Sequence, residues 1–208
     1  MERLDDSLKD ISEIRSMMER SSKFLSLSGL SGVSAGIVAL AGAGLAQWYQ
    51  LQVMGEIPLG GLEQVRNASV QTFFVIDAGL VFVVAVGLAI LFSIRMARRK
   101  GLPVWNSVAK RVIRELSIPL LAGAGMCLIF MAHGLFALVP SLSLVFYGVA
   151  LVNTSNFTLK ELRLLGIAEI VLGLAAAFAV RYSLFFWAAG FGILHIVYGA
   201  VMYARYER

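Results

Sequence analysis

Residues 117–155 read SIPLLAGAGMCLIFMAHGLFALVPSLSLVFYGVALVNTS, a run of 39 residues without Asp, Glu, Lys or Arg and with one histidine, His133. About 20 apolar residues are enough for one helix to cross a bilayer. The run therefore predicts two consecutive membrane-spanning helices. Pro140 and Ser141 lie near its middle and predict a tight turn between them.

The rest of the chain repeats this pattern of apolar runs between short polar breaks. No run alternates with period two, and a helix satisfies its own backbone hydrogen bonds inside a bilayer, so helices are expected. The prediction is an all-α polytopic membrane protein with six transmembrane helices in a domain over residues 26–204. The predicted spans are about 26–48, 72–94, 117–139, 141–155, 164–180 and 184–204.

The composition excludes most soluble classes of protein. The 208 residues are 59% hydrophobic and 15% charged, and the mean hydropathy is +0.80. A soluble domain is about 45–50% apolar and about 25% charged. The single cysteine excludes a disulfide framework and a Cys-rich metal site.

The basic residues predict the orientation. With the N-terminus in the cytoplasm, 16 of the 18 Lys and Arg residues fall on the cytoplasmic side, and only Arg66 and Arg181 fall outside. This asymmetry places both termini in the cytoplasm. It also explains the net charge of +5 without a nucleic-acid partner.

Two segments outside the spans have apolar stripes of their own. Residues 1–25 are expected to form an amphipathic cytoplasmic helix, whose first 24 residues suit a second copy or another protein as partner. The basic loop 95–116 is expected to carry a helix in the membrane interface, against anionic lipid headgroups. Residues 205–208 are expected to form a short cytoplasmic tail.

Two similar motifs carry buried ionisable residues. Residues 166–173 (GIAEIVLG) and 192–199 (GILHIVYG) share the pattern G-I-x-(E/H)-I-V-x-G, centred on Glu169 and His195. In each motif the ionisable residue shares a helical stripe with the flanking glycines, which allow close helix approach in lipid. These glycines are Gly166, Gly173, Gly192 and Gly199.

The spacing of the two motifs predicts that Glu169 and His195 meet. Tyr182 is 13 residues from each of them, so an antiparallel hairpin that turns near Tyr182 places both at one depth, in the cytoplasmic half of the membrane. The same register sets Gly173 level with Gly192. It sets Gly166 level with Gly199.

Other residues give weaker signals. Asp77 and His133, on the second and third spans, are candidates for a second polar pair near the outer side, or for structural roles alone. Gly32 and Gly36 indicate a tightly packed first span. Residues 122–129 (AGAGMCLI) resemble 189–196 (AGFGILHI), which is compatible with a 3+3 inverted repeat typical of secondary transporters.

These residues favour a small proton- or cation-coupled transporter or channel, in which Glu169 and His195 handle the proton or cation and Asp77 and His133 are further candidates. A structural hydrogen bond between Glu169 and His195, in a non-catalytic regulatory or assembly partner, is the first alternative. A haem or metal held by the histidines and acids is the second, although their predicted depths differ. No catalytic motif is found, so neither an enzyme nor a cofactor is expected.

Residues 18–32 (MERSSKFLSLSGLSG) and 190–208 (GFGILHIVYGAVMYARYER) resemble the opening and closing segments of a family of small bacterial polytopic membrane proteins. The resemblance extends over nearly the whole chain. It implies a six-helix plan and a location in the bacterial inner membrane, and it implies no particular activity, substrate or cofactor.

Overall fold

The computed structural model describes residues 28–54, 68–101 and 103–207, and all their regular elements are helices. The predicted all-α class is confirmed. Five helical segments are long and apolar enough to cross a membrane, as expected of a multi-pass membrane protein: Gly29–Gln52, Ser69–Arg99, Ser107–Ala132, Phe136–Phe157 and Val180–Tyr206. The predicted N-terminal helix 1–25 lies outside the described residues. The long helices are α2 (Gly29–Met54), α3 (Ala68–Arg99), α4 (Ser107–Ala132), α5 (Val139–Thr154) and α6 (Lys160–Phe178), followed by one rod made of α7 (Ser183–Trp187), the π segment η5 (Ala188–Leu194) and α8 (His195–Tyr206).

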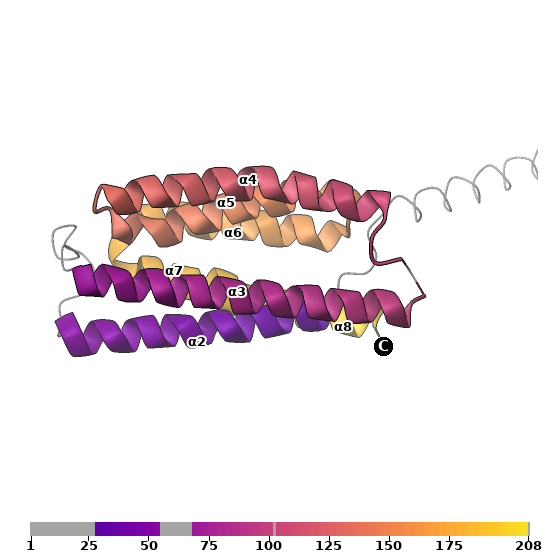
Figure 1. The fold of residues 1–208 in the computed structure, drawn as a ribbon, viewed down its shortest axis with the longest axis horizontal. Coiled ribbons are helices and arrows are strands. Elements are labelled where there is room, and N and C mark those ends of the chain that lie inside the picture. Colours follow the sequence, from indigo (N-terminus) through magenta and orange to yellow (C-terminus); the bar gives the residue numbers. More distant parts are fainter. Residues whose placement is uncertain (1–27, 55–67, 102, 208) are drawn as a thin grey trace, which may run out of the picture.

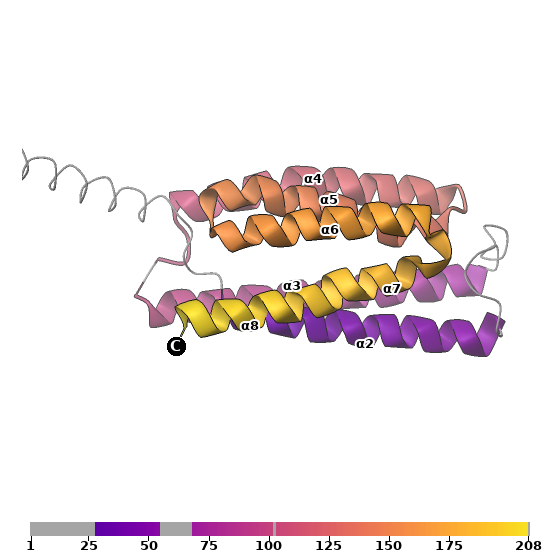
Figure 2. The same cartoon turned by 180° about the vertical axis from the view of Figure 1, so that it is seen from behind.

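The helices form two layers of three (Figure 1, Figure 2). One layer holds α4, α5 and α6, and the other holds α2, α3 and the α7–α8 rod. In the first layer α5 packs against both α4 and α6, and in the second α2 packs against both α3 and α8. The layers meet where α7 and η5 contact α5 and α6.

The turn between α4 and α5 lies earlier than predicted. Gly134 has a φ of +78°, and the amides of Gly134 and Leu135 donate to the carbonyls of Met131 and Phe130 (2.9 and 2.8 Å). This is a Schellman motif, which needs a residue in the left-handed region and so favours glycine. The short turn η2 (Phe136–Leu138) follows, and Pro140 lies in the first turn of α5, where its missing N–H removes no helical hydrogen bond.

Residues 95–116 also differ from the predicted interfacial loop. Helix α3 continues to Arg99, and α4 already begins at Ser107, where the Asn106 side chain accepts a hydrogen bond from the amide of Ala109 (2.7 Å). The apolar stripe of this segment belongs to the first turns of α4, which bury Ala109 and Val112 against the bundle. The apolar stripe has the helical period that was predicted. However, it lies on the same continuous helix, α4, as the membrane-spanning residues that follow it, and not on a separate interfacial helix.

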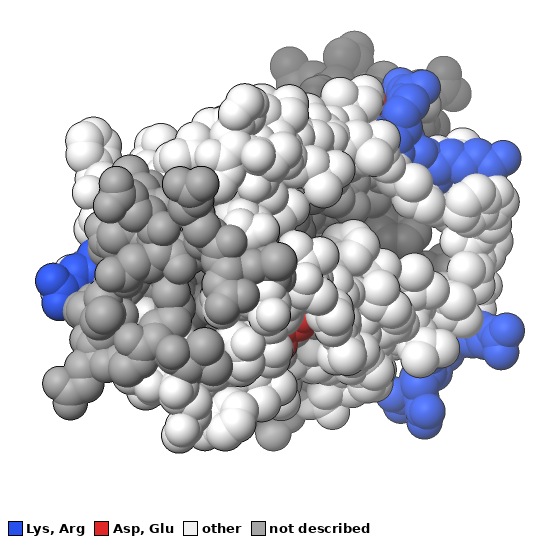
Figure 3. Space-filling view, turned by 60° about the vertical axis from the view of Figure 1, so that its left-hand side comes forward, with Lys and Arg blue, Asp and Glu red and all other residues white. Residues whose placement is uncertain are grey.

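One end of the bundle, called here the basic end, is where α3 ends and α4 and α6 begin (Figure 1). In the space-filling view blue side chains gather toward this end (Figure 3). Arg181 lies at the other end, in the turn η4 (Val180–Tyr182). The described basic residues of the basic end are Arg95, Arg98, Arg99, Lys100, Lys110, Arg111, Arg114, Lys160, Arg163 and Arg205.

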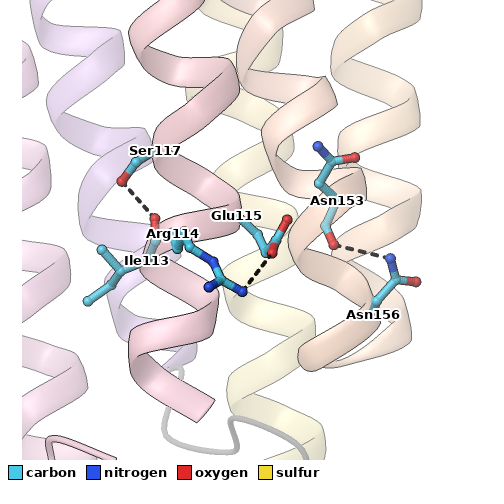
Figure 4. Close-up of polar contacts among 6 residues, drawn as sticks. All are labelled: Ile113, Arg114, Glu115, Ser117, Asn153 and Asn156. Atoms are coloured by element: carbon cyan, nitrogen blue, oxygen red, sulfur yellow. Dashed lines mark hydrogen bonds and ion pairs between the residues drawn. The ribbon is translucent and has the colours of Figure 1, made fainter. Parts of the chain in front are cut away.

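Polar contacts on α4 and at the end of α5, which runs into η3 (Ser155–Phe157), are local (Figure 4). Each joins residues of one helical turn, so these contacts do not hold α4 to α5. They link Arg114 to Glu115 (3.5 Å), Ser117 Oγ to the Ile113 carbonyl (2.7 Å) and Asn156 Nδ2 to the Asn153 carbonyl (3.2 Å).

The C-terminal end of α8 makes longer-range contacts, which we call the C-terminal clasp. The Arg205 guanidinium and the Tyr206 hydroxyl both donate to Glu161 Oε1 on α6 (2.8 and 2.9 Å), and so join the two layers. The Glu207 carboxylate accepts from the hydroxyl of Ser28 and the amide of Gly29. A carboxylate at the N-terminus of α2 satisfies free amides and complements the helix dipole.

Candidate functional site

Glu169 and His195 meet at the buried boundary between the two layers. Glu169 lies in the middle of α6 and is 0% exposed, and His195 is the first residue of α8 and is 5% exposed. Their closest atoms, His195 Nδ1 and Glu169 Oε1, are 3.3 Å apart. The contact predicted from the 13-residue spacing about Tyr182 is therefore present in the structure.

The glycines of the two motifs do not contact one another, although the predicted hairpin register sets Gly173 level with Gly192 and Gly166 level with Gly199. Gly166 and Gly173 face α5, where a Cβ on Gly166 would lie 2.8 Å from the Gly148 carbonyl oxygen. Gly192 and Gly199 face α2, beside Leu40 and Val33. Each motif therefore uses its glycines within its own layer, whereas Glu169 and His195 contact each other across the boundary.

Gly32 and Gly36 of α2 pack on the side where Gly192 and Gly199 face that helix. A Cβ on Gly32 would lie 3.1 Å from the Gly199 Cα, and one on Gly36 would lie 2.6 Å from the Gly192 carbonyl oxygen. The prediction that these glycines mark a tightly packed first span is confirmed. Their packing partner, the rod of η5 and α8, was not predicted.

The π segment η5 places acceptors around the His195 ring. His195 Nδ1 lies 3.0 Å from the Gly190 carbonyl oxygen as well as 3.3 Å from Glu169 Oε1. A carbonyl oxygen accepts hydrogen bonds and never donates them, so Nδ1 must carry a proton. In neutral His195 this leaves Nε2 as an acceptor.

Tyr147 on α5 supplies the donor for that acceptor. Its hydroxyl lies 2.9 Å from His195 Nε2, and the two rings lie 5.4 Å apart between centroids. The Tyr147–His195–Glu169 set, called the polar cluster below, therefore joins α5, α8 and α6. Sequence reasoning did not identify Tyr147, because a tyrosine in an apolar span gives no signal of its own.

Glu169 is the least satisfied member of the polar cluster. Neither carboxyl oxygen has a hydrogen-bond partner among the described residues, and both are buried. Oε2 points toward Gly190, where any Cβ would collide with it and with Leu144. A buried carboxylate is costly unless a cation or proton compensates it, and the imidazole of His195 is the group placed to do so.

Asp77 and His133 do not form the second pair considered from the sequence. Asp77 lies on α3 beside Gly42 of α2, and His133 is the C-cap of α4 in the other layer. Within the described ranges the two side chains make no hydrogen bond or ion pair with each other.

The residues described here provide no metal centre. They contain no group of three or more His, Cys, Asp or Glu side chains able to hold a metal ion. His133 terminates α4, whereas His195 lies inside the polar cluster with both ring nitrogens already engaged. This arrangement gives no support to a haem ligated by the two histidines.

Comparison of the chain with protein-family models, with curated proteins and with solved structures finds no match. The polar cluster is therefore the feature of the described residues that bears on function. It combines an imidazole, a phenol and an unsatisfied carboxyl group at a buried contact between two layers of apolar helices.

Proposed function

We propose that this protein moves protons or small cations across a membrane, with Glu169 and His195 as the binding pair. The observation that carries the proposal is the buried Glu169 carboxyl group, which has no hydrogen bond to either oxygen and lies 3.3 Å from His195 Nδ1. Imidazole and carboxyl groups both bind and release protons, and their contact lets one proton or cation be shared between them. The pair can therefore gain and lose one cation at a modest cost.

The proposal includes a sixth span, α6. Its apolar part begins at Leu164, after Lys160, Glu161 and Arg163 at the basic end. It packs along α5 and runs antiparallel to it (Figure 2). Residues 164–178 rise about 22 Å at 1.5 Å per residue, which spans most of a hydrocarbon core.

The proposed topology has the basic end in the cytoplasm. The first described residues of α2 and the end of α8 lie together there, joined through Glu207, and the positive-inside rule favours this orientation. The Lys and Arg side chains of that end would face anionic headgroups. The resemblance of residues 18–32 and 190–208 to small bacterial membrane proteins suggests the bacterial cytoplasmic membrane.

A 3+3 inverted repeat is also part of the proposal. Helix α2 packs on α3 and on the last helix, and α5 packs on α6 and on α4. This is the pattern expected if two triplets of opposite orientation exchange their third helices.

The test is proton flux into liposomes that contain the purified protein, followed with an internal pH-sensitive dye. We expect Glu169→Gln to lower the protein-dependent flux about 100-fold, because a positioned acid–base group contributes on the order of 10²–10⁴ to proton transfer. Glu115→Gln is the control, since it removes an acid whose contact with Arg114 is local and lies outside the polar cluster, and it should retain the flux. Wild-type flux in Glu169→Gln would contradict the proposal.

A second candidate is a non-catalytic membrane partner in which the polar cluster only fastens the layers. The observation in its favour is that the cluster joins α5, α6 and α8 across the boundary. In this case the wild-type protein would give no flux above protein-free liposomes. Glu169→Gln would still change the unfolding free energy, by about 0.6–2 kcal/mol for an intramembrane polar contact.

A further inference from the structure

The surroundings of the polar cluster differ on its two sides. The Tyr147 hydroxyl lies 2.9 Å from Nε2, and farther toward the basic end Tyr198 on α8 carries the next hydroxyl. Toward the opposite end, Phe191 stacks on the His195 ring at 5.8 Å and Trp187 packs on Phe191 at 5.0 Å. An asymmetry of this kind gives a buried proton site access from one side.

Tyr198 continues the hydroxyl side. It is one turn after His195 on α8, and it packs beside Tyr147 against the buried cluster of Leu151, Leu162 and Leu165. Leu162 of that cluster directly follows Glu161 on α6, so the cluster brings Tyr198 to the part of α6 that carries Glu161.

Glu161 brings this series to the surface. Its side chain is 20% exposed at the basic end, and it accepts hydrogen bonds from Tyr206 and Arg205 in the C-terminal clasp. The groups therefore follow one another from buried to exposed. From the buried pair toward the surface the groups are Glu169, His195, Tyr147, Tyr198 and Glu161.

The opposite side lacks such a series among the described residues. Leu144 is 0% exposed and packs beside the Glu169 carboxyl group at Gly190. Ser141 and Ser183 are buried farther toward that end, and neither makes a hydrogen bond to the polar cluster. Leu144 and Phe191 therefore close the cluster on this side.

We propose that Tyr147 and Tyr198 line the route by which protons pass between the basic end and the Glu169–His195 pair. This inference rests on the proposed function and adds to it the side from which the site is loaded. In the neutral state the Tyr147 hydroxyl donates to Nε2, while Nδ1–H donates to the Gly190 carbonyl oxygen and lies 3.3 Å from Glu169 Oε1. A proton arriving through the hydroxyls binds Nε2, while Nδ1 keeps its proton on the Gly190 carbonyl oxygen. One proton thus enters, and the resulting imidazolium lies beside the Glu169 carboxylate and compensates its charge.

Cysteine accessibility tests the side of access independently of flux. In a Cys127→Ser background, Tyr198→Cys in liposomes is treated with a membrane-impermeant thiol reagent. Arg114→Cys reports the basic end and Arg181→Cys reports the opposite end, since both side chains are exposed there. We expect Tyr198→Cys to be modified from the same side as Arg114→Cys, and Leu144→Cys to be protected from both.

Flux measurements test the role of the hydroxyls. Tyr147→Phe and Tyr198→Phe each remove one oxygen atom and retain the ring, and we expect each to lower the flux about 10-fold or more. Trp187→Phe, on the aromatic side, is the control and should retain the flux. Melting of each variant in detergent verifies that its fold is intact.

The outcomes separate the two proposals. If Glu169→Gln retains the wild-type flux, the proposed function is wrong and the route is wrong with it. If Glu169→Gln abolishes the flux but both tyrosine variants retain it, only the route is overturned. Modification of Tyr198→Cys solely from the Arg181 side, or from neither side, also overturns the route alone.

Discussion

Contacts within the two layers differ in kind from contacts between them. Within a layer, glycines bring backbones together, as between Gly148 and Gly166 of α5 and α6 or between Gly36 and Gly192 of α2 and the rod. Between the layers, the contact is made by long side chains, among them Glu169 and His195. Backbone contacts leave no room for adjustment, whereas side chains can change rotamer or protonation, so change is easier at the boundary than inside either layer.

Breaking a glycine contact should have the largest effect on stability. In Gly36→Leu the added side chain meets the Gly192 carbonyl oxygen and the Ile196 backbone, which cannot move without separating the helices. We expect a loss of about 3 kcal/mol or more in unfolding free energy. Reversible unfolding in mixed micelles measures it.

Gly44→Leu is the matched control, because it lies on the same helix and a Cβ there meets nothing within 4 Å. Equal stability of Gly36→Leu and Gly44→Leu would show that the layers are not held by backbone contact.

Gly190→Ala should act on the boundary with a smaller cost. Its methyl group displaces Glu169 Oε2 and the end of Leu144, both of which are side-chain atoms that can turn away. We expect a loss of about 1–2 kcal/mol with the fold retained, and a changed contact between Glu169 and His195.

The titration of His195, followed by NMR of protein labelled at the histidine ring nitrogens, measures this change. Gly125→Ala is the control, since a Cβ there meets nothing within 4 Å. If the titration of His195 were identical to that of the wild type, a methyl group at Gly190 would not disturb the contact between Glu169 and His195, and this prediction would be wrong.

The smallest effect is expected at the C-terminal clasp. Burial raises the pKa of Glu161, but hydrogen bonds from its own backbone amide, from Tyr206 and from Arg205, with the charge of Arg205, outweigh it and hold the pKa below its usual range. Because the folded pKa is the lower one, the clasp stabilises the fold above the ordinary carboxyl pKa. That stability is lost as the pH falls through the folded value.

Glu161→Gln should therefore cost less than about 1 kcal/mol near neutral pH, since the Arg205 side chain is 64% exposed. The difference from the wild type should shrink as the pH falls below the ordinary carboxyl pKa and vanish below the folded pKa, where the carboxyl group is protonated in both states. Unfolding measured across this range tests the sign, with Glu115→Gln as a control whose contact is local. A difference that stays constant with pH would exclude the clasp as its source.

The sequence alone predicted the long helices and one contact between them, that of Glu169 with His195. Apolar runs of spanning length identify the helices, and equal spacing about Tyr182 brings Glu169 and His195 together. The same reasoning failed for glycine partners, because a glycine stripe allows close approach without specifying to which neighbour. Gly166 could face either adjacent helix, and in the structure it packs on α5.

Other features depend on tertiary structure that no local pattern encodes. Tyr147 is one of six tyrosines, and only the packing of α5 beside η5 brings it to His195. The sequence offers two signals for the turn between α4 and α5. Pro140 marks the start of a helix and Gly134 the end of one, and the pattern alone does not say at which of them the chain turns. The clasp at Glu207 joins residues 178 positions apart in the chain.

The π segment Ala188–Leu194 sets the rotational phase of everything that follows it. A residue advances an α-helix by about 100°, and a π segment holds roughly one residue more than the α-helix it replaces. Deleting one residue from this segment would therefore rotate α8 by about a quarter of a turn or more. His195 would leave α6 and Gly199 would leave α2 together, so the length of these seven residues constrains the protein more tightly than the identity of most of them.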